Sequence, residues 1–558
     1  MAGLCFLGAP VMTRRTVDRS FYLFHAPTMM LSVGYVVFWI ELYVIRMPEG
    51  HTSPLAAVLL AAWLGWMIVR DRETYAGCWA RWQALWSSWS PRTRAYVGCG
   101  AVLGSVTLLC GLSAALLPPH LIQEFDVLNY HITLPRQHLI LGSFRHIPWS
   151  TADLYLLPLD FALAPYWLMT ALPNKFPQFL FLTGVLGLGT SLAGKWGATA
   201  QAKILLIFGL LGSHYMGIQI GIGMLDIVMC YLALAALHSF LERQWGLAAV
   251  ELTLYFWSKS FIPIQVICVV LLTVVLYWFV RKCGFGQVGW TSENPLPPAE
   301  LTAYRKGMRN VLGIFVLASL VVGGPFVGKS LYYAGTPLFP FLTGRFMVNP
   351  HIDPQSPSWQ SLLTRVDQVL STKDQYGSGR SLKDFIVHFW LIAVPEKGVN
   401  NRYDYPVGLM YLLCLGPFVY CFLEAWRRKI FPIVPVLIIA FWVVWWLGSQ
   451  QMRFLVIPLT LMTAMVMARS VFHTGIFKAG VLLCVALVMI SVVRAHKRDF
   501  GKSAGDVLRP QDHWLIEQGE RSRSPLTIDF FDAAYAGVPV VVIGKDSVFV
   551  IDYEGKLP

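Results

Sequence analysis

One polar segment concentrates the side chains that could act as acids, bases or anion ligands. Residues 118–150 carry two carboxylates, two arginines and several histidines within a chain that is otherwise strongly apolar. They include Glu124, Asp126, His131, Arg136, His138, Arg145 and His146. Charged groups beside lipid are costly, so they usually serve a function. The segment therefore predicts a catalytic loop in which Asp126 or Glu124 acts as a general base.

Isolated charges inside or at the ends of apolar runs are a second set of candidates. They are Asp226, Lys259, Lys329 and Arg453. Arginine can offer two parallel donors to a phosphate, whereas lysine acts as a point charge. Lys259, Lys329 and Arg453 therefore predict an anion site, although long basic side chains also extend toward lipid headgroups without binding a ligand. Asp226 belongs either to this site or to a pair with a neighbouring cation.

Each loop candidate also has a structural interpretation. Asp126 could cap a helix that begins at the D-V-L-N sequence, and Glu124 could lie on a solvated face. His131 is expected to contact a substrate, either at a phosphate or at the molecule that accepts a transferred group. Alternatively, it packs as a hydrogen-bonded core histidine. His131, His138 and His146 are spaced by seven and eight residues, which does not suit a compact metal site on one helix. A divalent cation is therefore the weaker alternative, and we expect no other cofactor.

The composition places the chain among integral membrane proteins. Hydrophobic residues make up 56% of the chain and charged residues only 13%, against roughly a quarter charged in soluble domains. The net charge of +13 comes from Lys and Arg clusters between apolar runs, which is an orientation signal and not a nucleic-acid surface. The chain has no phosphate-binding glycine loop and no dinucleotide motif. The ten cysteines lie mostly in or beside apolar segments, so no disulfide or zinc site is expected.

The apolar runs predict a polytopic all-α protein with about 13 crossings. Each long run can cross roughly 30 Å of hydrocarbon. The expected helices cover residues 22–45, 54–70, 96–117, 176–193, 201–216, 222–241, 245–258, 261–281, 310–330, 405–424, 430–448, 453–470 and 476–494. Basic loops at 70–95, 282–309 and 427–429 are placed in the cytoplasm with the N-terminus. The loops at 118–150 and 331–404 and the C-terminus then lie outside.

This topology divides the chain into six parts. They are 1–117 with three membrane helices, 118–175 with the first outer loop, 176–330 with a central bundle, 331–404 with a substrate-covering loop, 405–498 with the last membrane helices, and 499–558 with a tail. Residues 154–172 are expected to form a helix at the outer interface, where Tyr and Trp are favoured. The tail predicts a small α/β appendage, because VPVVVIG and SVFVID have a strand pattern.

An ordered set of motifs on the outer face resembles the GT-C superfamily of membrane glycosyltransferases. Asp126, Tyr130 and His131, followed by Leu134 and Pro135, match its D-x-x-x-Y-H and L-P pattern. Its later landmarks correspond to Asp226 in GMLDIVMC, Lys259 in YFWSKSF, Gly335–Phe341 in GTPLFPF, and Arg453 and Phe454 in QQMRFLV. The likeness extends over roughly residues 118–470 and favours the branch of protein O-mannosyltransferases and aminoarabinose transferase. The chain differs from this branch in having Phe125 between its two carboxylates and in having two additional helices before the loop.

The resemblance implies a transferase that uses a polyprenyl-phosphate-linked sugar donor and an extracytoplasmic acceptor. The acceptor is a lipid, a glycan or a protein, and the enzyme resides in the plasma membrane. Asp126 or Glu124 would take the acceptor proton, transfer would invert the anomeric carbon, and basic residues would stabilise the leaving phosphate. A lipid-linked glycan polymerase or ligase is the alternative among enzymes. A lipid or solute transporter and a non-catalytic assembly subunit are the alternatives outside enzymes.

Overall fold

A computed structural model supplies the structure of this chain. It describes residues 24–45, 55–70, 80, 82–116, 126–147, 151–168, 175–217, 219–293, 295–343, 363, 364, 366, 367, 370, 376, 377, 379–393, 403, 407–503, 540–543 and 548–551. Statements below about structure refer to these residues.

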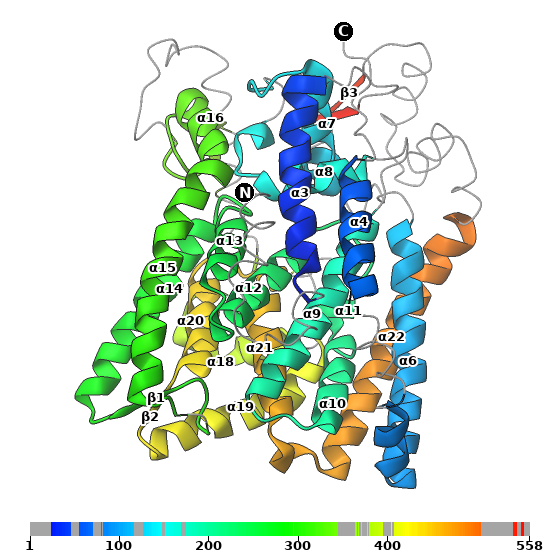
Figure 1. Cartoon of the computed structure of the whole chain (residues 1–558), viewed down its shortest axis with the longest axis vertical. Helices are drawn as coiled ribbons and strands as arrows, with labels where there is room; N and C mark the ends of the chain where they lie inside the picture. Colours follow the sequence, from blue (N-terminus) through cyan, green and yellow to red (C-terminus); the bar gives the residue numbers. More distant parts are fainter. Residues whose placement is uncertain are drawn as a thin grey trace.

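The fold is an all-α bundle. Figure 1 shows most helices running along the long axis, with α16, α7 and α8 toward one end and the β1–β2 pair toward the other. The N-terminal elements are α3 (Ala26–Ile40), η1 (Glu41–Ile45), α4 (Leu55–Arg70), α6 (Pro91–Leu116), η2 (Val127–His131), α7 (Thr133–Leu141), η3 (Thr151–Leu154) and α8 (Pro158–Trp167). The central elements are α9 (Phe176–Lys195), α10 (Ala200–Leu211), α11 (His214–Gly217), α12 (Asp226–Leu241), α13 (Trp245–Phe256), α14 (Ile262–Lys282), β1 (Gln287–Gly289), α15 (Pro298–Val322) and α16 (Gly324–Ala334). The C-terminal elements are α18 (Leu382–Leu391), α19 (Leu409–Arg427), β2 (Ile430–Pro432), α20 (Ile433–Leu447), η5 (Met452–Leu455), α21 (Val456–Ala468), η6 (Ser470–Phe472), α22 (Gly475–Ser503), β3 (Val540–Ile543) and β4 (Val548–Ile551).

Among the described residues, six helices are long and apolar enough to cross a membrane, or seven if the bent pair α15–α16 is one span. The six are Ala26–Ile45, Pro91–Leu116, Phe176–Lys195, Ile262–Lys282, Leu409–Arg427 and Gly475–Ala495. Several of the other expected crossings, including α10, α12, α13 and α20, are apolar helices of 10–17 residues. The length and composition of these helices identify a multi-pass membrane protein.

Helix α14 illustrates how the sequence produces a lipid-facing helix. Pro263 lies in its first turn, where a missing N–H costs nothing, and Arg281 and Lys282 in its last turn oppose the negative end of the helix dipole. Residues such as Leu271 and Val274 are more than half exposed. An apolar face that exposed would be unfavourable in water, so it is suited to contact with lipid tails.

The centre of the bundle is made from shorter helices. Every residue of α21 is buried, and this helix packs against α9, α10, α19 and α20. The pairs α12–α13 and α9–α12 pack beside it. Helices that are apolar on all sides are typical of a core surrounded by other helices. The functional side chains described below are positioned at the ends of these central helices.

The region predicted as one helix over 310–330 differs in the structure. The helix α15 begins earlier, at Pro298, within the expected 282–309 loop, and it breaks before α16 with a bend of 56°. Pro325 in the first turn of α16 has no N–H to donate to the preceding turn, which interrupts the helix. Gly323 lets the chain pack closely at this point, because a Cβ there would lie 2.5 Å from the Trp257 ring. The chain therefore bends where α16 begins.

The helix expected within 154–172 is present as α8, but its surroundings differ from the prediction. All ten of its residues are buried, including Tyr166 and Trp167, and it packs on α3. The Tyr166 hydroxyl donates to the Met30 carbonyl at 2.9 Å. Its aromatic side chains therefore lie inside the protein and not among lipid headgroups.

The polar regions are described only in part. Most of the SWQSLLTRVDQVL stretch in 331–404 lies outside the described residues, as does most of the tail beyond Ser503. The tail's two strand-like runs form an antiparallel hairpin of β3 and β4. Two features were not predicted: α18, which begins with a capping box of Ser381 and Asp384, and the parallel pairing of β1 with β2.

Candidate functional site

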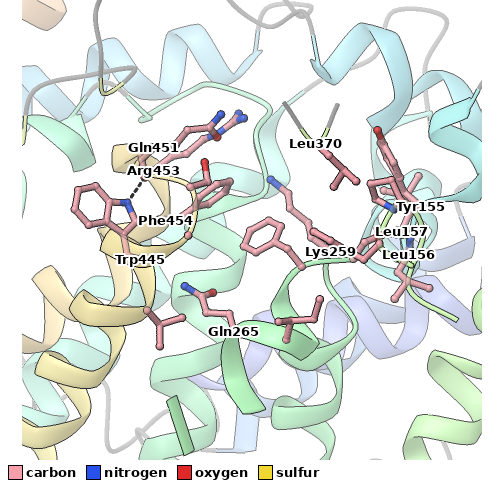
Figure 2. A pocket seen from close by; sticks show the side chains of 18 of the residues that line it. Tyr155, Leu156, Leu157, Lys259, Gln265, Leu370, Trp445, Gln451, Arg453 and Phe454 are labelled. Atoms are coloured by element: carbon pink, nitrogen blue, oxygen red, sulfur yellow. Dashed lines mark hydrogen bonds between the residues drawn. The ribbon is translucent and has the colours of Figure 1, made fainter. Parts of the chain in front are cut away.

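A cavity of about 400 Å³ opens among the ends of the central helices. Figure 2 shows side chains from several separate segments pointing into it. Its polar lining consists of Tyr130, Tyr155, Lys259, Ser260, Gln265, Ser449, Gln451 and Arg453. Its apolar lining includes Leu156, Leu157, Phe261, Ile264, Val444, Trp445 and Phe454. A mostly apolar wall with a few polar groups is typical of a ligand site.

Two cations lie on the wall of this cavity. Lys259 follows α13, and Arg453 lies in η5. The fold brings these two residues, which are far apart in the chain, to the same cavity. Phe454 contacts both, with its ring centroid 5.9 Å from the Lys259 ammonium and 5.3 Å from the Arg453 guanidinium carbon. The two side chains can both donate hydrogen bonds to an anion bound in the cavity.

The segment that carries Arg453 is fixed by hydrogen bonds. The Trp445 indole N–H donates to the Gln451 carbonyl at 2.7 Å, as Figure 2 shows. The Arg453 Nε donates to the Gln451 side-chain oxygen at 3.0 Å. These two bonds orient the turn between α20 and α21 and direct the guanidinium along the cavity wall.

Asp126 lies beside Arg453. Its Oδ2 is 3.3 Å from the Arg453 Nη1, and its side chain is 25% exposed. The Asp126 side chain makes no capping hydrogen bond to the helix that follows, so the structure does not support the capping interpretation. Asp126 is not among the residues that line the cavity, so its link to the cavity is its contact with Arg453. Glu124 lies outside the described residues.

Asp226 is placed behind Lys259, away from the cavity lining. The distance from its Oδ1 to the Lys259 ammonium is 3.6 Å, and its side chain is 1% exposed. Neither of its carboxylate oxygens accepts a hydrogen bond from any described residue. Of the two interpretations from the sequence, the pairing of Asp226 with a neighbouring cation is the one that this geometry supports.

His131 is buried next to Tyr130 and bonds to a carboxylate that the sequence analysis did not single out. Its Nδ1 is 2.7 Å from the Asp160 Oδ1, and both side chains are fully buried. Burial lowers the pKa of His131 well below its ordinary value, and nearby Lys259 and Arg453 act in the same direction. Burial raises the pKa of Asp160, opposed only in part by Lys259. Both pKa shifts favour a neutral His131 imidazole hydrogen-bonded to a protonated Asp160 carboxyl.

Two tyrosines complete the polar rim. Tyr130 and Tyr155 both line the cavity, with ring centroids 6.1 Å apart. Burial raises the pKa of each phenol, and the Asp126 carboxylate adds to the effect. Both hydroxyls therefore remain protonated at neutral pH, which makes them hydrogen-bond donors for a sugar or phosphate oxygen.

Lys329, expected at the anion site, belongs to another cluster. Its ammonium lies 2.8 Å from the Asp153 Oδ1, and His138 Nε2 is 2.7 Å from the same oxygen. His146 Nδ1 and the Ile147 N–H reach the other oxygen, at 3.1 and 2.8 Å. Because all these groups surround one buried carboxylate, the cluster anchors the loop to α16. Lys329 does not line the cavity.

The charge of this cluster follows from its contacts. Burial alone would raise the pKa of Asp153, but Lys329, His138 and the hydrogen bonds outweigh it and hold the pKa well below the ordinary value. Of the three candidate histidines, His138 and His146 face Asp153, whereas His131 faces Asp160. In the described part of the chain, no three His, Cys, Asp or Glu residues are close enough to hold a metal ion.

The GTPLFPF element forms another side of the cavity. Gly335 ends α16 in the left-handed conformation, with φ of 64°, which favours glycine. The Thr336 hydroxyl then donates to the Phe341 carbonyl at 2.6 Å and closes a compact turn. The turn places Pro340 and Phe341 on the cavity wall.

The residues that the sequence analysis overlooked are Asp153, Asp160 and Tyr155. Asp153 and Asp160 interrupt the apolar stretch DLYLLPLDFALAP, so the argument applied to Asp226 also applied to them. Their partners could not be identified in the same way, because Lys329 lies 176 positions from Asp153 in the chain.

The assembled geometry can bind an anion and remove a proton. Lys259 and Arg453 supply positive charge, Asp126 supplies a base beside them, and the apolar wall can accommodate a hydrocarbon chain. No protein-family model, curated protein or solved structure matches this chain.

Proposed function

We propose that this protein is a membrane glycosyltransferase that moves a sugar from a polyprenyl-phosphate donor to an extracytoplasmic acceptor. One observation carries the proposal. Two cations, Lys259 and Arg453, come from distant segments to one cavity whose other walls are mostly apolar, and a carboxylate from a third segment, Asp126, contacts Arg453. The motifs that resemble the GT-C superfamily include these same residues.

In the proposed reaction, Asp126 accepts the proton of the attacking acceptor hydroxyl. The acceptor oxygen bonds to the anomeric carbon as the bond from that carbon to the lipid phosphate oxygen breaks. Direct displacement inverts the anomeric centre. The leaving phosphate gains negative charge, and Lys259 and Arg453 stabilise it more strongly than the intact donor.

The hydrocarbon chain of the donor has a suitable second space. A cavity of about 450 Å³ is lined only by apolar side chains from α18, α19, α20 and α21. Helix α20 is common to both cavities, with Val444 and Trp445 on the first and Trp442 and Val443 on the second. A lipid bound with its phosphate at Lys259 and its tail along α20 would bury both ends favourably.

The full topology is also part of the proposal. Some thirteen crossings place the N-terminus in the cytoplasm and the cavity on the extracytoplasmic side of a plasma membrane. The short helices α10, α12, α13, α20 and α21 complete the set with the six long ones. The basic residues near β1, β2 and the start of α15 then lie at the cytoplasmic end, as the positive-inside rule requires.

Lipid binding by the purified full-length protein tests the donor class. We expect undecaprenyl phosphate to bind at least about tenfold more tightly than undecaprenol, because charge-assisted contacts to phosphate favour it by roughly 1.5–3 kcal/mol. Arg453→Gln should remove this preference and still bind the alcohol. Arg428→Gln, at an exposed pair with Glu424, is the matched control and should leave the preference intact. Equal affinity of the unaltered protein for both lipids would contradict the proposal.

A further inference from the structure

A second buried polar system lies away from the cavity and joins four helices. Glu251 on α13 has a fully buried side chain, and its Oε1 lies 2.5 Å from the His25 Nδ1. The other ring nitrogen of His25, Nε2, is 3.0 Å from the His238 Nδ1 on α12. His238 Nε2 is 2.7 Å from the Ser191 hydroxyl on α9. A carboxylate, two imidazoles and a hydroxyl thus form one continuous chain.

The carboxylate of Glu251 is held by further hydrogen bonds. The Thr28 hydroxyl donates to its Oε1 at 2.9 Å, and the Ser239 hydroxyl donates to its Oε2 at 2.7 Å. The Tyr231 hydroxyl joins the group through Thr28, at 3.0 Å. These hydrogen bonds satisfy both carboxylate oxygens inside an otherwise apolar bundle, where an unpartnered polar group would be strongly disfavoured.

The His238 end of this hydrogen-bonded network approaches the protein surface. Glu242 Oε1 lies 3.8 Å from the His238 Nε2 and 2.7 Å from the Lys195 ammonium. The side chains of Lys195 and Glu242 are 32% and 30% exposed. On the neighbouring helix α15, Glu300 pairs with Arg243 at 3.8 Å. The hydrogen-bonded network therefore extends from the fully buried Glu251 carboxylate to the partly exposed Lys195–Glu242 pair.

The hydrogen-bonded network and the cavity lie toward opposite ends of the antiparallel pair α12–α13. Asp226 and Lys259 occupy one end, and His238 occupies the other. The twelve positions from Asp226 to His238 correspond to roughly 18 Å of helix. Among the described residues, the chain of hydrogen bonds given above does not include any side chain that lines the cavity. The network is thus separate from the residues proposed for sugar transfer.

We propose that Glu251 is a proton-binding site, loaded from the Lys195–Glu242 surface through His238 and His25. Before loading, the His238 Nδ1–H donates to the His25 Nε2, and the His25 Nδ1–H donates to the carboxylate. An incoming proton binds the His238 Nε2, the His238 Nδ1 proton moves to the His25 Nε2, and the His25 Nδ1 proton moves to the Glu251 Oε1. One proton enters, one carboxylate becomes a carboxylic acid, and both rings remain neutral. Buried chains of Glu and His are the usual form of proton relays in membrane proteins.

The test follows the Glu251 carboxylic acid by infrared difference spectroscopy on the full-length protein in lipid films after a step to lower pH. We expect a protonated-carboxyl band that is absent in Glu251→Gln. In His238→Gln and in His25→Gln the band should form on the order of 10²-fold more slowly, because each variant removes one transfer step. A band that persists in Glu251→Gln, or one that forms at the original rate in both histidine variants, overturns the proposal.

Ser239→Ala is the control for a purely structural effect. It removes one donor to the ionised carboxylate but no member of the relay. The band should therefore appear at a pH higher by roughly one unit, because the charged form loses a hydrogen bond, while its rate of formation is unchanged. This variant also decides the question if Glu251→Gln fails to fold. No upward change in Ser239→Ala would show that the band does not arise from Glu251.

Discussion

Two buried aspartates, each beside a histidine, should differ in how much stability the same substitution removes. Asp153 faces Lys329 and is held ionised, whereas burial favours the protonated form of Asp160. We expect Asp153→Asn to destabilise the protein by about 3–5 kcal/mol, because it leaves the buried Lys329 without its counter-charge. Asp160→Asn should cost less than about 1 kcal/mol, because it replaces a group that is already neutral. Unfolding of the detergent-solubilised variants measures both, and equal losses would contradict this assignment.

The same contrast gives a pH dependence. The folded pKa of Asp153 is lowered, so its contribution is fully present above the unfolded value of about 3.9 and is lost as the pH falls through the folded pKa. The stability difference between the unaltered protein and Asp153→Asn should therefore be largest at neutral pH and shrink below about pH 4. A difference that stays constant from neutral to acid pH would show that Asp153 is not ionised in the folded protein.

The Lys259–Asp226 pair can be tested by a double-substitution cycle. Lys259→Met leaves the buried Asp226 carboxylate without a cation and should cost about 3–5 kcal/mol of folding free energy. The double variant Asp226→Leu, Lys259→Met should recover most of that folding free energy. It should still bind undecaprenyl phosphate no more tightly than undecaprenol. Additive losses in the cycle would show that the two residues do not form a stabilising pair.

At the scale of elements, Gly335 sets the direction of the chain after α16. An alanine there would have to adopt the left-handed conformation, which costs about 1–2 kcal/mol. We expect Gly335→Ala to lower the unfolding temperature and to weaken lipid binding, because Pro340 and Phe341 follow on the cavity wall. Gly328→Ala is the matched control, since it is in the same helix and its Cβ would meet open space. It should stabilise α16 by about 1 kcal/mol. A loss of stability in Gly328→Ala equal to that in Gly335→Ala would contradict this role.

The sequence predicts helices well where long apolar runs define them. The expected helices at 176–193 and 261–281 match α9 and α14 to within two residues. Local features with weaker signals were missed, although the Ser381–Asp384 capping box of α18 was visible in the sequence. The three-residue strands β1 and β2 are too short for a periodic pattern, and their pairing depends on the packing around them.

The candidate site shows more clearly that contacts between distant segments cannot be predicted from local sequence patterns. The residue types at Asp126, Lys259 and Arg453 were sufficient to single them out. The structure places Lys259 and Arg453 on one cavity and Asp126 in contact with Arg453. Their pairing could not be predicted, because 327 positions separate Asp126 from Arg453 and no local pattern encodes such a contact. Lys329 was misplaced for the same reason, since only the fold shows that Asp153 is its partner.

At the scale of the whole molecule, the proposed topology predicts which positions a membrane-impermeant reagent can reach. Arg145 is exposed in the first outer loop, and Cys283 is exposed just after α14 at the end placed in the cytoplasm. In intact cells, a charged maleimide should label Arg145→Cys but not the native Cys283. Permeabilised cells should show both labels by peptide mass spectrometry. Labelling of Cys283 in intact cells would reverse the orientation.

The most direct test of the transferase proposal compares Asp126→Asn with the unaltered protein in the native host, by mass spectrometry of extracted polyprenyl-phosphate lipids. Asp126 is the carboxylate that contacts Arg453 and is the base in the proposed reaction, so its loss should slow transfer by on the order of 10²–10⁴-fold. At equal protein level, one sugar-loaded lipid should accumulate, and its mass would identify the donor sugar. Arg428→Gln, at an exposed ion pair outside the cavity lining, should leave the lipid pool unchanged. A lipid pool and surface glycans in Asp126→Asn that both match those of the unaltered protein would contradict the role of Asp126 as the base.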